Sequence, residues 1–89
     1  MSDKPGGALA PIKPERLVRE VREICGDHRS GTSSDLVYEQ RFARMIGEVR
    51  DRRLDGDRAT VMAALTPLRD EGVVTPQEWD RLLKSLGLA

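Results

Sequence analysis

The chain has 89 residues, and its 15 Lys and Arg residues balance its 15 Asp and Glu residues, so its formal net charge is zero. This balance argues against a chain built mainly to bind nucleic acid, because a basic excess supplies most non-specific affinity for phosphates. Aromatic residues make up 3% of the chain, too few for a base-stacking surface. A single cysteine excludes an intramolecular disulfide.

Residues 1–13 contain two prolines and two adjacent glycines and show little periodicity. They predict a flexible N-terminal tail, ordered only on contact with a partner, ahead of a single helical domain over residues 14–89. The N-terminal stretch lacks the apolar core of a signal peptide, and no apolar run approaches about 18 residues. We therefore expect a cytoplasmic protein with no membrane partner.

The first half of the domain carries two amphipathic patterns with helical spacing. One helix is expected to begin at Pro14, which suits a first helical turn, and to stop at Gly26. The next is expected from about Asp35 to Leu54, after several N-cap candidates in residues 32–34. The expected buried stripes are Leu17, Val18, Val21, Ile24 and Cys25 in the first helix, and Tyr38, Phe42, Met45, Ile46 and Val49 in the second, which has Leu36 or Val37 at its start.

A third helix is expected from Arg58 to about Glu71, capped by Asp57 and ended by Gly72. Its stripe continues across Pro67, which predicts a kink or a brief break there. The stripe consists of Val61, Leu65 and Leu68.

The fourth helix has the clearest local signals. Thr75 and Glu78 fit a capping box, and Pro76 occupies the first helical position between them. Gly87 provides a stop, with Leu88 folding back over the last turn. The expected apolar face is Trp79, Leu82, Leu83 and Leu86. The fold class predicted is all-α: a small bundle of three to four helices with a C-terminal helical hairpin.

The segment LRDEGVVTPQEWDRLLKSLG, residues 68–87, joins a leucine-bearing helix to an acidic-aromatic helix through an aliphatic-Thr turn. It resembles the short C-terminal domain family, SHOCT, although it lacks the extra basic residue usual in that family's second helix. The resemblance implies a hairpin used for oligomerisation or binding, with Trp79, Leu82 and Leu83 as contacts and no catalysis. The matching residues are Leu68, Asp70, Glu71, Gly72, Val74, Thr75, Glu78, Trp79, Leu82 and Leu83.

Motifs that carry chemistry are sparse. Cys25 and His28 have the spacing of half a zinc site, but the sequence has no other Cys or His to complete it. A glycine turn after residue 50 has the place of a calcium loop, yet Arg53 and Met62 stand where ligands are needed. The hydroxyl-rich residues 30–34 favour helix capping over anion binding. We therefore expect no catalytic residues, no metal and no cofactor, and a non-enzymatic protein.

The leading functional hypothesis is a protein–protein interaction module, a small helical adaptor or assembly subunit that also binds itself. Small domains are marginal unless they pack well or pair, and exposed apolar surface then becomes an interface. The expected contact set is Phe42, Met45, Trp79, Leu82, Leu83 and Leu86; the competing interpretation is that these residues form the intramolecular core.

Two alternatives belong to other classes. The arginine-rich second helix suits a nucleic-acid-associated regulator, with candidate contacts at Arg41, Arg44, Arg50, Arg52 and Arg53. A helix-turn-helix over residues 57–86 would also read DNA, but acidic residues near the start of its last helix oppose phosphates. The second alternative is an accessory subunit of a larger enzyme complex.

Overall fold

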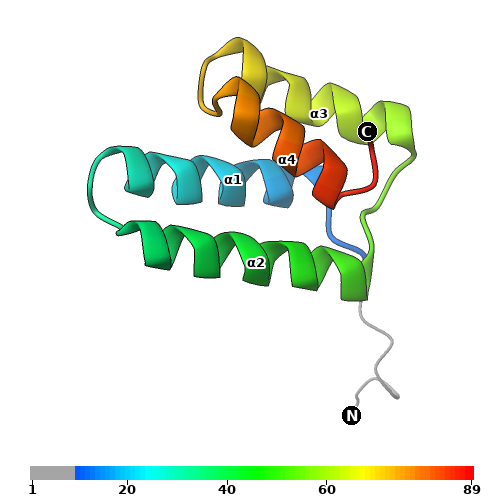
Figure 1. The fold of residues 1–89 in the computed structure, drawn as a ribbon. Helices are drawn as coiled ribbons and strands as arrows, with labels where there is room; N and C mark the ends of the chain where they lie inside the picture. The colour runs from blue at the N-terminus through cyan, green and yellow to red at the C-terminus, as the bar shows by residue number, and fades with distance from the viewer. Residues whose placement is uncertain (1–9) are drawn as a thin grey trace.

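The computed structural model describes residues 10–89, and their fold is all-α as predicted (Figure 1). Within this range the chain forms four helices and no named strand. The elements are α1 (Pro14–Arg29), α2 (Asp35–Arg52), α3 (Arg58–Asp70) and α4 (Pro76–Ser85).

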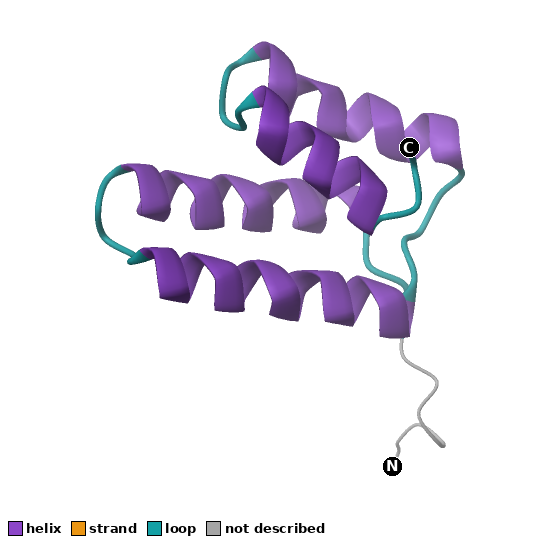
Figure 2. Cartoon of the chain, viewed as in Figure 1, coloured by secondary structure: helices purple, strands orange, loops and turns teal. Residues whose placement is uncertain are grey.

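The helices form two stacked hairpins (Figure 2). The α1–α2 hairpin makes one layer, and α1 packs against both α2 and α3. The chain then turns after α3 and returns as α4 along the α1–α2 hairpin (Figure 1). Among residues 10–89 no helix combines the length and apolarity required to cross a membrane.

The core is built from the predicted stripes, because helical periodicity places them on the facing sides of the four helices. Leu17, Leu65, Leu68 and Leu82 are among the most completely buried side chains. The expectation that Leu36 or Val37 opens the stripe of α2 is wrong, since these side chains are 66% and 40% exposed. Leu36 lies two residues before Tyr38, more than half a turn around the helix, and therefore points to solvent.

The end of α1 differs from the sequence expectation. Helix α1 continues through Gly26 to Arg29, and the positive φ of 85° occurs instead at Gly31. Contacts with other parts of the chain stabilise the extra turn. Asp27 accepts a hydrogen bond from Arg41 at 2.8 Å, and Arg29 donates to the Gly72 carbonyl at 2.8 Å. These contacts offset the roughly 1 kcal/mol that a glycine costs inside a helix.

Helix α3 runs through Pro67 as one continuous helix, so of the two alternatives expected there, a kink or a brief break, the break is absent. The preceding residue, Thr66, donates its hydroxyl to the Met62 carbonyl at 2.7 Å. The helix ends as expected at Gly72, whose φ is 74°.

The predicted caps are confirmed. Ser34 and Asp57 accept hydrogen bonds from backbone N–H groups in the first turns of α2 and α3. Thr75 and Glu78 form the capping box of α4. At its other end the Leu88 N–H donates to the Leu83 carbonyl at 2.8 Å, beyond Gly87 with a φ of 74°.

The segment before α1 is anchored to the α2–α3 connection. The Ile12 N–H donates to the Arg53 carbonyl and its carbonyl accepts from the Asp55 N–H, both at 2.8 Å. Ile12 is 4% exposed and belongs to the core. Most of the predicted tail, residues 1–9, lies outside the described residues. The prediction that the tail includes Ile12 is wrong, because Ile12 is part of the folded domain.

This anchor requires an unusual backbone at Arg53. Its φ is 71° and its ψ is 157°, a region that is essentially restricted to glycine. A side chain there costs about 1–3 kcal/mol. The hydrogen bonds that fix Arg53 use only its backbone: its N–H donates to Val49 and its carbonyl accepts from Ile12.

We predict that Arg53→Gly raises the free energy of unfolding by about 1 kcal/mol, because glycine relieves the strain while losing more chain entropy on folding. Urea denaturation measures the change. Arg53→Ala is the matched control, since it removes the same side chain but keeps a Cβ, and it is expected to give no gain. Equal stabilisation by both variants would contradict the explanation from backbone strain.

Candidate functional site

One hollow lined by described residues is an open groove of about 580 Å³. It lies where the end of α2, the start of α3 and the end of α4 meet (Figure 1). Its volume is in the range of ligand pockets, which run from about 300 to 1,000 Å³. Its apolar lining consists of Ile46, Val49, Leu54, Val61, Leu86 and Leu88.

The rim of this groove is basic. Four cationic side chains line it, Arg50, Arg53, Arg58 and Lys84, against one carboxylate, Asp57. Asp57 is committed to the Thr60 N–H, which holds its pKa below the usual value.

Within residues 10–89, only part of this positive charge is satisfied. Arg58 donates to the Leu88 carbonyl, and Lys84 lies 3.0 Å from Asp80. Arg50 and Arg53 form no hydrogen bond or ion pair through their side chains within residues 10–89. The groove therefore combines a floor with three part-exposed leucines, Leu54, Leu86 and Leu88, and two guanidinium groups that have no partner among the described residues.

A second cluster lies at the other end of α4 and is part-buried. One carboxylate oxygen of Glu78 accepts from the Thr75 N–H at 2.9 Å, and the other accepts from the Tyr38 hydroxyl at 2.8 Å. The Cys25 thiol lies 3.7 Å from the second oxygen. His28 stacks on the Tyr38 ring with 4.2 Å between ring centroids.

The ionisation of these groups makes the cluster structural in character. Burial opposes the charge on Glu78, but hydrogen bonds from the Thr75 N–H and the Tyr38 hydroxyl outweigh it, so the pKa of Glu78 is lowered. Burial and then the nearby Glu78 raise the pKa of Cys25 to about 11. Burial also raises the pKa of Tyr38, with a further contribution from Glu78. Cys25 thus stays a neutral thiol at pH 7, which makes it a poor nucleophile.

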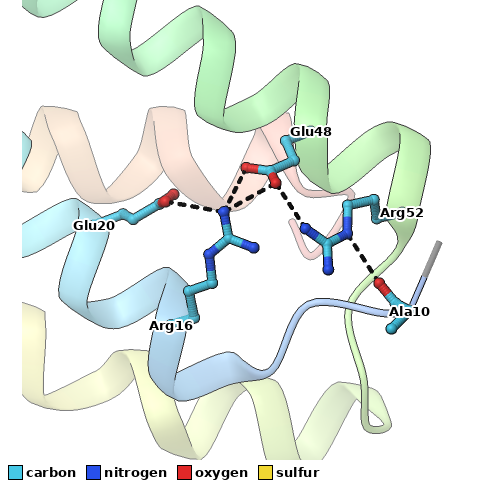
Figure 3. A network of polar contacts seen from close by, with 5 residues as sticks. All are labelled: Ala10, Arg16, Glu20, Glu48 and Arg52. Carbon is cyan, nitrogen blue, oxygen red and sulfur yellow. Dashed lines mark hydrogen bonds and ion pairs between the residues drawn. The ribbon is translucent and has the colours of Figure 1, made fainter.

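Two of the candidate nucleic-acid arginines are engaged inside the chain. Arg52 donates to Glu48 at 2.8 Å and to the Ala10 carbonyl at 2.9 Å, and Arg16 joins the same carboxylate from α1 (Figure 3). Arg41 donates to Asp27 at 2.8 Å. These contacts tie α2 to α1 and to the segment before it.

The remaining candidate arginines point to two sides of α2. Arg44 lines a small hollow between α1 and α2, of about 170 Å³, together with three glutamates. Arg50 and Arg53 instead line the large groove. The five arginines therefore form no single basic face.

The expected protein-contact set is also divided. Phe42, Met45 and Leu82 are buried in the core of the chain and are not available at its surface. The other three, Trp79, Leu83 and Leu86, are partly buried against that core. Of these, only Leu86 lines the groove. Trp79 instead contacts Arg69, whose guanidinium lies 5.3 Å from the centre of its ring.

Cys25 and His28 turn to different partners. Cys25 faces Glu78, while His28 Nε2 lies 2.7 Å from an Asp35 carboxylate oxygen. Within residues 10–89 no three His, Cys, Asp or Glu side chains are grouped as metal ligands would be.

Helix α4 uses one face to dock on the α1–α2 hairpin. Arg81 donates to both carboxylate oxygens of Glu39, at 3.0 and 2.6 Å, and lies 4.1 Å from the Phe42 ring centre. Glu78 lies on the same face. In a DNA-reading arrangement α4 would therefore present mainly Gln77, Asp80 and Lys84.

Sequence reasoning missed both sites. Arg50 and Arg53 were grouped with the other arginines, and nothing in their spacing separates them. Glu78 was identified as a capping residue but not as a tertiary contact. The capping-box pattern in the sequence is the same whether or not the second carboxylate oxygen of Glu78 also accepts a hydrogen bond from a distant residue such as Tyr38.

Comparisons with known proteins add no relative: no family model, no curated protein and no solved structure matches this chain. The SHOCT-like resemblance of residues 68–87 thus remains an expectation.

We predict that Glu78→Gln lowers the free energy of unfolding at pH 7 by about 1 kcal/mol, the typical value of a lost hydrogen bond. Because the folded-state pKa of Glu78 is lowered, its contribution is present above the unfolded pKa of about 4.3 and is lost as the pH falls. The difference between wild type and variant, measured by urea denaturation, should therefore shrink below pH 4.3.

The matched control is Glu23→Gln, an exposed residue that forms no ion pair within residues 10–89. It should change stability little at any pH. A Glu78→Gln deficit that stays constant down to acid pH would show that the ionised carboxylate is not the stabilising group.

Proposed function

We propose that this chain is a non-enzymatic protein-interaction module that binds a partner through the groove between α2, α3 and α4. The observation that carries the proposal is an open groove in which the part-exposed Leu54, Leu86 and Leu88 lie with Arg50 and Arg53, whose side chains have no partner within residues 10–89. Part-exposed apolar side chains bordered by charged groups match the arrangement of protein interfaces, which have an apolar centre and a polar rim.

The composition of the groove supports a protein partner over a small-molecule reaction. Arginine and leucine lie together there, and arginine is enriched at protein interfaces. The clustered titratable groups Cys25, Tyr38 and Glu78 lie at the opposite end of α4, and they are engaged with one another. They hold the helices together and do not line the groove.

Sedimentation at micromolar concentration and a pull-down from the native cell test the proposal. We expect either self-association or a retained partner, because a module of this kind has a partner protein or a second copy in its groove. A strict monomer that retains no partner would contradict the function.

Two substitutions locate the interface. Leu86→Ser removes a partly buried side chain from the groove and should weaken the association. Leu36→Ser is the matched control, because Leu36 is an exposed leucine at the far end of α2, and it should have no effect. The reverse pattern would place the interface at the start of α2. Circular dichroism spectra check that both variants fold.

A further inference from the structure

We infer that the groove takes an acidic amphipathic helix, a partner segment with leucine-like side chains on one face and carboxylates beside them. The inference rests on the proposed function and specifies the chemistry of the partner. Three observations lead to it: the charge around the groove, the apolar side chains of its floor and the backbone of Arg53.

The charge of the rim selects an anionic occupant. Arg50 and Arg53 have no partner for their side chains within residues 10–89, and Arg58, which donates only to a neutral carbonyl, adds positive charge nearby. The one carboxylate in the lining, Asp57, is already occupied by the Thr60 N–H. A carboxylate-bearing segment complements this rim and also steers its own approach.

The apolar floor selects an amphipathic occupant. The part-exposed side chains of this floor are Leu54, Leu86 and Leu88, whereas Ile46, Val49 and Val61 also line it but are buried in the core. An extended phosphate backbone offers nothing apolar to cover them, whereas a helix with anchors at three- and four-residue spacing does. This difference favours a protein segment over a nucleic acid.

The backbone at Arg53 gives the third observation. Its φ of 71° and ψ of 157° suit glycine, and its structural hydrogen bonds use only backbone atoms. An arginine side chain therefore stands at a strained backbone position, where it makes no hydrogen bond or ion pair within residues 10–89. A strained residue at the edge of a groove is typical of a binding site, where the side chain acts on a ligand.

Synthetic peptides test the inference directly. Three helical peptides share leucines at positions i, i+3, i+4 and i+7 and carry Glu, Gln or Lys on the flanks. Each is titrated into the isotope-labelled full chain and followed by amide chemical shifts. The Glu peptide should shift the amides of Arg50, Leu54 and Val61 saturably, and the Gln and Lys peptides should bind more weakly.

Charge reversal sharpens the test. Arg50→Glu should weaken the Glu peptide by about tenfold, as expected for a lost charge-assisted hydrogen bond, and strengthen the Lys peptide. Arg53→Gly should also weaken the Glu peptide, although it relieves strain. Arg44→Glu is the matched control and should leave binding unchanged, since Arg44 also has no side-chain partner in the described part of the chain but lies outside the groove.

Several results would overturn the inference. Equal binding of the Glu and Gln peptides would remove the role of charge, and shifts outside the groove would remove the site. Salt-dependent binding of a mixed-sequence DNA duplex that needs Arg44, Arg50 and Arg53 alike would favour a nucleic-acid ligand. If the pull-down retains a partner but no peptide enters the groove, the proposed function stands and this inference fails.

Discussion

The attachment of α4 to the α1–α2 hairpin through Glu78 is the constraint on which the rest of the structure depends. A helix of ten residues is not stable by itself in water. One carboxylate oxygen of Glu78 closes the capping box with Thr75, and the other accepts the Tyr38 hydroxyl. The same side chain therefore fixes where α4 begins and where it docks. Leu82, 1% exposed, then fills the core one turn further on.

The groove exists because its two walls are fixed at different places. The end of α4 carries Leu86, and its direction follows from the docking at Glu78 and the Arg81–Glu39 pair. The end of α2 is fixed by the strained Arg53 backbone, which pairs with Ile12. A change at either anchor should therefore alter the groove even though neither Glu78 nor Ile12 lines it.

Helix positions, caps and most of the core followed from the sequence, because they depend on spacing within one segment. Ser34, Asp57 and the Thr75–Glu78 box act on backbone groups three residues away, so their roles can be predicted locally. The failures involve distant partners. Helix α1 passes Gly26 because Asp27 and Arg29 find contacts on other elements, and Ile12 becomes core because it meets residues 53–55. The groove could not be predicted for the same reason: its lining comes from three elements.

Hydrogen exchange of the α4 backbone amides in Tyr38→Phe tests the central claim most directly, because this variant removes only the hydroxyl that Glu78 accepts. The account predicts that α4 amides such as Leu83 exchange about tenfold faster, while those of Val21 and Ile24 in α1 keep their protection. Unchanged protection in α4, or equal acceleration in all four helices, would contradict the claim that this bond holds α4 in place.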